Sequence, residues 1–444
     1  MKLEFIKSIL LVFLVALSVT LTLNIWSYQG NYEYAEDDEA IDAKLNGTKQ
    51  TKRNVIKPSQ IIFHQGNDLL GYKNKEKETN FYANMREWSL YNFRMMDEGE
   101  EIPTDNADNW IEIVFPTAIP SSVINELFPT DDSLNLTYDS DFKRIYMILD
   151  GSLQQGQVIF ASGDPNKMNI RASVQNIAQI QDFLERTKQA EEFTEYIQVT
   201  LEQRPTIYVP NRPEITGRKY RYTAINPDTN TLQSIFFTNP SSIVSSPNPE
   251  GGQVYSDSQR EVTVRGYYME YTNFLTSESQ NEQATILPNT IERLLNTSLD
   301  YINTHDGWLV DEGIQFQLSD LNRLTNSIEY RMVHQNYPVF SYEGLATMEL
   351  TIQNMTVYQY RRPLMRLTQS YDGEPTDIMT GQKLLQSIDS SQTQISKEEI
   401  QDIQLGYRIQ QHTGGQIFDL IPTWFVKTYR GWQGVYTITQ QGGE

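Results

Sequence analysis

The chain has 444 residues, no cysteine, and a formal net charge of −21 from 36 basic and 57 acidic residues. This balance disfavours binding to nucleic acid, whose phosphates require Lys and Arg, and the lack of cysteine excludes disulfides and thiolate metal sites. A chain this long exceeds what one hydrophobic core usually organises, so we expect several domains. The mean hydropathy of −0.52 indicates a large water-soluble portion.

The N-terminal segment is typical of a membrane anchor. Residues 8–26 contain no charged side chain and follow Lys2 and Lys7. A helix of this length spans roughly 28 Å, close to the ~30 Å hydrocarbon thickness of a bilayer. Trp26 and Tyr28 fall where aromatic rings favour the headgroup region, and an acidic run follows. We therefore expect a single-pass protein of the cell membrane, with a cytoplasmic N-terminus and an extracytoplasmic C-terminal region.

The alternative is a cleaved secretory signal, which needs an apolar core of about 7 to 15 residues and a small-x-small cleavage site. Ala16 and Ser18 are the one small pair in the apolar run, and they lie in its middle. Cleavage there would leave too short an apolar core, so a retained anchor is favoured. An exported region without cysteine suits a protein of a Gram-positive bacterium.

The anchor also carries small and polar side chains on two faces. Ala16, Thr20 and Asn24 are spaced by four and share one side of a helix, whereas Ser18 and Thr22 lie on the opposite side. Such positions allow close backbone approach and interhelical hydrogen bonds in lipid. The alternative is that the hydroxyl groups bond to the preceding turn and Asn24 is hydrated near the interface. We predict helix–helix contacts through these five residues.

The sequence predicts residues 1–32 as a cytoplasmic stub and transmembrane helix, and residues 33–205 as an N-terminal extracytoplasmic domain. Residues 35–58 are polar without a sustained apolar period, which is typical of a tether. Runs of β-branched and aromatic residues predict strands at residues 110–115, 145–149 and 158–160. Helical spacing of apolar residues predicts an amphipathic helix through Val174, Ile177, Ile180 and Leu184.

Three prolines, Pro205, Pro210 and Pro213, indicate a domain boundary. We predict a middle α+β domain at residues 206–370 and a C-terminal α+β domain at residues 371–444. The expected fold class is therefore α+β, with helices packed on antiparallel sheets in several extracytoplasmic domains after one transmembrane helix.

In the middle domain we expect a loop at residues 239–252 and a strand at residues 261–271. A helix should follow, capped by Asn289 with Glu292 and ended by Gly307. Four further strands are predicted at residues 314–318, 328–333, 348–353 and 356–361.

The last domain is expected to repeat this order in shorter form after a linker at residues 370–375. A helix is predicted around residues 384–388, and a capping box at residues 396–399 predicts the start of another. Two strands, at residues 405–409 and 421–426, should flank a turn at His412.

The sequence offers little chemistry. The four histidines, His64, His305, His334 and His412, lie far apart and show no metal-ligand spacing. No phosphate-binding, dinucleotide-binding or serine-nucleophile motif is present. We therefore predict no catalytic residue, no cofactor and no metal.

Paired carboxylates occur at Asp131–Asp132 and at Asp139 with Asp141, and residues 164–169 lack the remaining ligands of a calcium loop. Two carboxyl groups must face one cleft to act as acid and base, which adjacent acids in a loop seldom do. A solvated loop is the favoured interpretation, and an exported hydrolase is the rival that would need one of these acids or histidines.

The chain resembles the YycH family. The resemblance rests on Ile6-Lys-Ser8 and the apolar span after it, on Trp26-x-Tyr28, on Asn31-Tyr-Glu33, and on the closing strand of residues 420–424. Length and the single anchor agree. Gly30 stands where the family pattern would have proline.

This resemblance implies a non-enzymatic regulator of the WalK (YycG) histidine kinase, a two-component sensor that controls cell-wall metabolism. It also implies a YycI-like membrane partner, lateral contacts between anchor helices in the lipid bilayer, and a three-domain ectodomain. If the anchor helix binds one signalling state of the kinase more tightly than the other, it shifts the equilibrium between the two states by the difference in binding free energy. A membrane-anchored extracytoplasmic domain that binds and senses a ligand remains the alternative.

Overall fold

The computed structural model describes Ser18 and most of residues 43–435; the gaps are residues 98, 105–108, 131–139, 151–154, 176–179, 181–190, 202–203, 214, 216–219, 226–227, 279–290, 312, 372–377, 391–392, 394 and 413–414. The chain divides into two compact units, residues 1–42 and residues 43–444.

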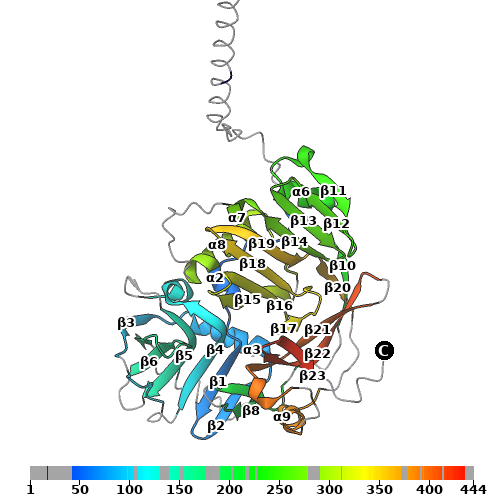
Figure 1. Cartoon of the computed structure of the whole chain (residues 1–444). Coiled ribbons are helices and arrows are strands. Elements are labelled where there is room, and N and C mark those ends of the chain that lie inside the picture. Colours follow the sequence, from blue (N-terminus) through cyan, green and yellow to red (C-terminus); the bar gives the residue numbers. More distant parts are fainter. Residues whose placement is uncertain are drawn as a thin grey trace, which may run out of the picture. The chain divides into compact units, whose positions relative to one another are not determined.

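Within the described residues, the first half of this unit forms a nine-stranded antiparallel sheet (Figure 1). The strand order is β3-β7-β6-β5-β4-β1-β2-β8-β9. The bounds are β1 Gln60–Gln65, β2 Asp68–Tyr72, β3 Leu90–Met95, β4 Asn109–Pro120, β5 Asp141–Asp150, β6 Gln155–Ala161, β7 Ile170–Val174, β8 Phe193–Val199 and β9 Ile207–Pro210. The helices with described bounds in this half are α2 Lys52–Val55, α3 Lys75–Met85 and α4 Ile124–Leu127. The strands predicted at residues 110–115, 145–149 and 158–160 are confirmed.

The two faces of this sheet differ because side chains alternate along each strand. Phe63 pairs with Ile111 and faces the apolar core, where its ring meets Phe81 of α3 at 5.4 Å between centroids. His64 and Glu112 lie on the opposite face and hydrogen-bond to each other. One face is therefore apolar, and the other carries buried polar groups.

Within the described residues, the second half forms a fourteen-stranded sheet, ordered β11-β12-β13-β14-β19-β18-β16-β17-β21-β22-β10-β20, with β15 on β16 and β23 on β22. The bounds are β10 Tyr220–Ile225, β11 Val244–Pro247, β12 Gln253–Ser256, β13 Arg260–Arg265, β14 Tyr268–Asn273, β15 Ile314–Asn322, β16 Ser327–His334, β17 Tyr337–Phe340, β18 Thr347–Gln353, β19 Thr356–Pro363, β20 Arg366–Tyr371, β21 Asp402–Gln411, β22 Ile417–Thr428 and β23 Gly431–Val435. Its helices are α6 Thr229–Phe236, α7 Leu275–Glu278, α8 Ile291–Thr304 and α9 Gly381–Asp389. The only parallel pair within the described strands is β17 with β21. The four strands predicted between residues 314 and 361, and both strands near the C-terminus, are confirmed.

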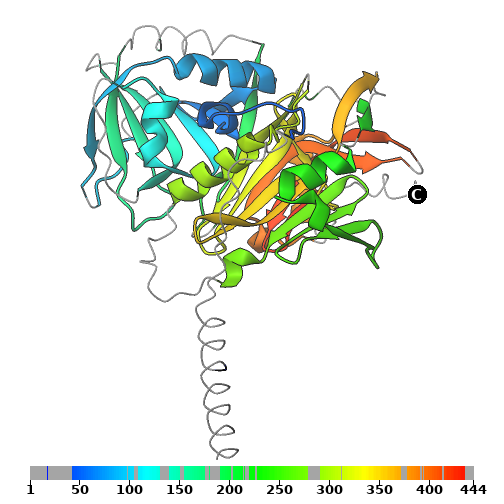
Figure 2. The same ribbon diagram turned by 90° about the horizontal axis from the view of Figure 1, so that it is seen from above.

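Helix α8 lies between the two sheets (Figure 2). Its apolar stripe, including Leu294 and Ile302, packs on β15, β16, β18 and β19, and the helix also touches β4. The predicted helix is confirmed, but the predicted cap at Asn289 lies outside the described residues. The residue with left-handed backbone is Asp306 (φ 48°), not Gly307. The Gly307 N–H donates to the Ile302 carbonyl at 2.9 Å, which completes a Schellman-type end.

The two sheets share one contiguous cluster of buried apolar side chains. Polar contacts join them as well: the Leu321 N–H of β15 donates to Thr117 Oγ1 of β4 at 3.1 Å. Strands from both sides of the boundary predicted at residue 370 also pair, as β10 does with β22. The domain boundaries themselves stay predictions.

The prediction of a tether is wrong from residue 43 onward. Leu45 and Ile56 are buried, and α2 forms within this stretch. The backbone N–H groups of Gly47 and Thr48 donate to the carbonyls of Asp306 and Trp308 at 3.0 and 2.9 Å. The polar sequence of this segment does not predict its packing, because the packing depends on backbone hydrogen bonds to the distant loop that follows α8.

Three other local predictions are also wrong. Val174 ends strand β7 and pairs with Leu90, so it does not start a helix; Ile180 is helical and buried, while the rest of the predicted helix lies outside the described residues. The single strand expected at residues 261–271 is a hairpin, β13 and β14, turned at Gly266 (φ 54°). The loop expected at residues 239–252 contains strand β11.

The helix expected from the capping box at residues 396–399 is a single 3-10 turn, Lys397–Glu399. Ser396 donates its hydroxyl to the Glu398 carboxylate and makes no capping bond. The helix expected around residues 384–388 is confirmed as α9. Most of the linker predicted at residues 370–375 lies outside the described residues, but its first two residues end β20.

Candidate functional site

Of the five residues predicted to make helix–helix contacts, the structure describes Ser18. Ser18 is helical and exposed, whereas Ala16, Thr20, Thr22 and Asn24 lie outside the described residues. Among the residues that are described, no helix is both long enough and apolar enough to cross a bilayer. Contacts between membrane helices stay a prediction.

His64 belongs to a buried network on the polar face of the first sheet. Its Nε2 lies 3.1 Å from the Glu112 carboxylate, and its ring stacks on Trp110 with centroids 3.4 Å apart. The Tyr208 hydroxyl donates to Glu112 at 2.7 Å, and Arg144 forms an ion pair with it. Burial alone would raise the pKa of Glu112, but these hydrogen bonds and the Arg144 charge lower it below its ordinary value. The network connects Tyr208 of the edge strand β9 with Glu112 of β4.

His305 is packed among aromatic rings at the end of α8. It is 4 % exposed and lies against Tyr301, Tyr360 and Phe236 at 5.6 to 5.8 Å between centroids. Burial, and the nearby charge of Arg362, lower its pKa to about 3. A neutral imidazole enclosed in this way is part of the core.

Of the other two histidines, His334 is held by packing and His412 by a hydrogen bond. His334 is 2 % exposed beside the Tyr407 ring, and burial lowers its pKa to about 4. His412 Nε2 lies 2.6 Å from the carboxylate of Asp419, which is 3 % exposed, across the β21–β22 turn. The structure does not bring any two of the four histidines together.

The carboxylates singled out in the sequence do not converge on a cleft. Asp131, Asp132 and Asp139 lie outside the described residues, and Asp141 forms an ion pair with Lys167 and accepts from Ser162 Oγ at 2.9 Å. Among the described side chains, no group of three or more His, Asp or Glu could hold a metal ion.

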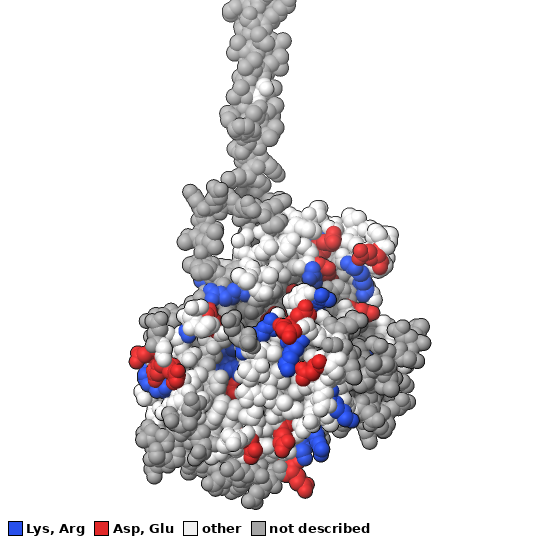
Figure 3. All heavy atoms as spheres, turned by 60° about the horizontal axis from the view of Figure 1, so that its bottom comes forward, with Lys and Arg blue, Asp and Glu red and all other residues white. Residues whose placement is uncertain are grey.

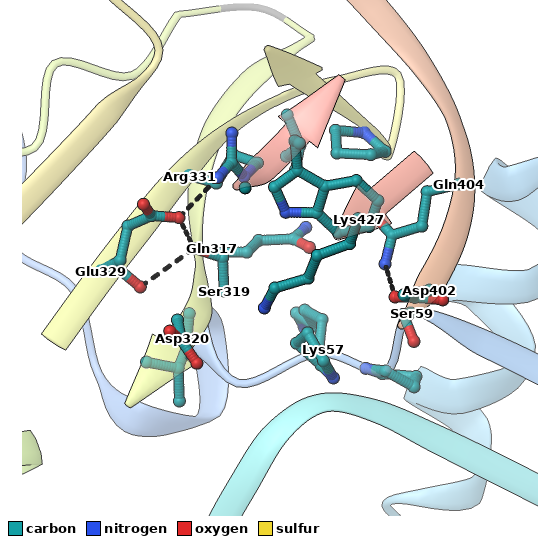
Figure 4. A pocket seen from close by; sticks show the side chains of 17 residues that line it. Lys57, Ser59, Gln317, Ser319, Asp320, Glu329, Arg331, Asp402, Gln404 and Lys427 are labelled. Atoms are coloured by element: carbon teal, nitrogen blue, oxygen red, sulfur yellow. Dashed lines mark hydrogen bonds and ion pairs between the residues drawn. The ribbon is translucent and has the colours of Figure 1, made fainter. Parts of the chain in front are cut away.

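A cavity of about 240 Å³ lies where the segment before β1 meets the second sheet (Figure 4). Its lining comes from residues 57–59, from the middles of β15 and β16, from β21 and β22, and from Trp432 of β23. Ligand sites are concave and commonly lie between structural layers. This cavity is therefore the candidate functional site of the described region.

Most acids of the cavity already have partners. Glu329 accepts from Arg331 at 2.6 Å and from Ser319 Oγ at 2.5 Å. Asp402 accepts from Gln404 Nε2 at 2.9 Å, which is drawn as a dashed line in Figure 4, and from the Ile403 N–H at 2.8 Å. Burial raises the pKa of Asp402, and the positive charges of Lys143 and Lys427 only partly oppose this.

Two lysines of the cavity differ from these acids. Within the described part of the chain, neither Lys57 nor Lys427 has a carboxylate within the 4.0 Å of an ion pair. Burial and the like charges of Arg86 and Arg53 lower the pKa of Lys57 to about 8. Lys427 lies 5.9 Å from the Trp432 ring centroid, as a cation over an aromatic face.

The one face of the molecule drawn in Figure 3 shows no concentration of a single charge among its described residues. On the face drawn in Figure 3, basic and acidic side chains of the described residues lie beside each other. Mixed charge of this kind keeps a surface soluble without favouring a polyanion.

Nothing in the amino-acid sequence predicts this cavity. Its charged residues come from five separate segments of the chain, and no motif or spacing connects Lys57 with Asp402 or Lys427. Lys57-Pro58 follows an apolar pair in the sequence, but this pattern by itself does not indicate a binding site.

Comparison with known proteins identifies the family. Residues 4–192 match the model of the YycH protein N-terminal domain, and residues 204–443 match that of the YycH protein C-terminal domain. A curated Bacillus subtilis protein, the two-component system WalR/WalK regulatory protein YycH, is 20% identical over 455 residues, covering 96% of this chain and 95% of that protein. The crystal structure of YycH from Bacillus subtilis aligns with a TM-score of 0.66 at 14% identity, over 89% of this chain and 99% of that one. The chain belongs to the YycH family.

Proposed function

We propose that this protein is a non-enzymatic regulator of a two-component system with a WalK (YycG)-type sensor histidine kinase, and that it thereby controls cell-wall metabolism. The observation that carries the proposal is the full-length similarity to the Bacillus subtilis protein, which is named a WalR/WalK regulatory protein. Nearly complete coverage of both chains supports a shared role better than similarity over one domain would.

The histidines support the non-enzymatic part of this proposal. His305 and His334 are 4 % and 2 % exposed in aromatic surroundings, and His64 is hydrogen-bonded to the buried Glu112. A general base must reach its substrate proton directly or through one water. His305 and His334 are instead enclosed in the core, and His64, which lines a pocket, is held by its hydrogen bond to Glu112.

We place the regulatory contact in the membrane. In this proposal residues 8–26 cross the cytoplasmic membrane once, with the N-terminus inside, and pack beside the helices of the kinase and of a YycI-like membrane protein. Ala16, Thr20 and Asn24 provide one contact face, and Ser18 and Thr22 the other. A partner that binds one kinase state more tightly shifts the equilibrium toward that state.

The test replaces residues 8–26 with an unrelated apolar helix of equal length and measures a WalR-dependent reporter gene in cells. Regulation should be lost while the protein still reaches the membrane in normal amount. If regulation survives the exchange, the anchor does not make the regulatory contact, and the ectodomain must make it instead.

Crosslinking supplies the matched control. The chain has no native cysteine, so Ala16→Cys and Ser18→Cys each report on a single face. Val19→Cys lies between the faces and should crosslink least to either partner. Equal crosslinking at all three positions would contradict a specific helix–helix contact.

A further inference from the structure

The cavity beside Lys57 contains two lysines, Lys57 and Lys427, for which the described residues provide no ion pair. Its three lining acids are Asp320, Glu329 and Asp402, and the last two are engaged as described. Asp320 accepts a long hydrogen bond of 3.4 Å from Thr117 Oγ1. Figure 4 shows Lys427 and Lys57 among the side chains that line the cavity.

Lys57 is surrounded by charges of its own sign on the inner side. Arg53 of α2 and Arg86 after α3 both repel it, and burial adds to the cost of its charge. The cavity side presents Asp320 from β15, Asp402 from β21 and Lys427 from β22. The amine of Lys57 does not stabilise the fold at this position, because a buried charged group without a partner is destabilising.

The remaining lining suits the body of a small organic molecule. Trp432 presents an aromatic wall supported by Phe340, with ring centroids 5.1 Å apart, and Phe340 stacks on Phe425 at 3.9 Å. Gln317 adds an amide that can donate or accept. The volume of about 240 Å³ is just below the usual ~300–1,000 Å³ of small-molecule sites, which limits the occupant to roughly amino-acid or dipeptide size.

We propose that this cavity binds a small organic carboxylate, whose anionic group is held by the amines of Lys57 and Lys427 and whose body packs on Trp432. Two ammonium groups with no protein carboxylate in ion-pair range supply charge-assisted hydrogen bonds to the carboxylate oxygens. The site draws on the segment before β1 and on β15, β21, β22 and β23, so an occupant would touch both halves of the unit. This inference does not depend on the proposed kinase regulation.

The experiment uses the purified full-length chain in detergent and racemic N-acetylalanine as the probe. Lysine acetylation by a water-soluble reagent is followed residue by residue with mass spectrometry. Lys57 should be among the fastest-reacting lysines because its pKa lies near 8. N-acetylalanine should protect Lys57 and Lys427 together, whereas N-acetylalanine amide, which lacks the anionic group, should protect neither.

Two variants and one control complete the design. Lys427→Met should raise the probe concentration that half-protects Lys57 by about tenfold, as expected for the loss of one charge-assisted hydrogen bond. Lys57→Met should do the same for Lys427. Lys77→Met removes a lysine that pairs with Glu192 at the surface and should leave protection unchanged.

Thermal melting of each variant verifies folding. Lys57→Met should melt no lower than the parent chain, since it removes a repelled charge. Four results would overturn the proposal: no protection by N-acetylalanine, equal protection by its amide, equal protection by inorganic phosphate, or full protection in both lysine variants.

Discussion

At the residue scale, Asn303 of α8 connects three parts of the chain with one side chain. Its Oδ1 accepts from the Gln50 N–H at 2.9 Å and from the indole Nε1 of Trp308 at 2.8 Å, and its Nδ2 donates to the Gln50 carbonyl at 2.9 Å. Trp308 is fully buried, so its indole N–H has no access to water. The amide group therefore satisfies polar atoms that the fold has removed from solvent.

Replacing Asn303 with alanine should lower the free energy of unfolding by about 2–3 kcal/mol, because a buried indole N–H loses its acceptor. Urea denaturation followed by tryptophan fluorescence measures the change. Asp300→Ala, at an exposed position of the same helix, is the control and should stay within about 0.5 kcal/mol of the parent. Equal effects of the two substitutions would contradict this role of Asn303.

The buried histidines predict how the protein responds to acid. The pKa values of His305 and His334 lie near 3 and 4 in the folded chain and near 6.5 in the unfolded chain. Between these limits the unfolded chain binds more protons, so stability falls as the pH drops below 6.5. Each histidine contributes a slope of up to about 1.4 kcal/mol per pH unit in its window.

The free energy of unfolding, measured from pH 7 to pH 4, should therefore decrease steeply in the parent chain. His305→Phe removes one titrating group and should reduce the slope by up to about 1.4 kcal/mol per pH unit. A slope that is unchanged in this variant would mean that His305 gains its proton without unfolding.

At the element scale, residues 45–48 behave as a short partner of the loop after α8. Gly47 lies so close to this loop that an added Cβ would come within 2.4 Å of the Trp308 carbonyl oxygen and 2.5 Å of the Asp306 carbonyl oxygen. Both are backbone atoms, which cannot turn aside as a side chain would. The segment after the predicted anchor is therefore fixed to the folded unit from residue 45 onward.

Gly47→Ala should destabilise the protein by about 1–3 kcal/mol or more, since the clash must displace backbone. Gly163→Ala is the matched control, because its added Cβ would meet nothing nearer than the Lys143 side chain at 3.5 Å. Melting temperatures by calorimetry compare the two. A Gly47 variant as stable as the Gly163 variant would restore the interpretation of this segment as a tether.

At the scale of the whole molecule, the two sheets are joined by one apolar cluster, by α8 and by the Thr117 contact with β15. Residues 43–444 should therefore unfold in a single calorimetric transition, because neither half can lose its partner without exposing apolar surface. Thr117→Val removes the acceptor of the buried Leu321 N–H and should lower the melting temperature without splitting the peak. Two separate transitions would show that the halves fold independently.

Sequence patterns correctly predict the elements whose periodicity is strong and local, which are α8, α9 and the strands at residues 314–361, 405–409 and 421–426. In these segments apolar spacing matches the face that the element buries, so local pattern and final packing agree. Resemblance at the N-terminus and in residues 420–424 was enough to identify the family.

Other features of the fold depend on contacts between segments that are distant in the sequence, and no local pattern predicts them. Residues 43–58 are polar in sequence, yet they pack because Asn303 and the loop after α8 offer them hydrogen bonds. The cavity forms because Lys57, β15 and β22 lie close together in the fold. Their positions in the sequence do not predict this proximity. The spacing of apolar residues predicts the structure of a segment when the residues that it packs against are near in sequence. Where the segment packs against distant residues, those contacts determine its structure instead.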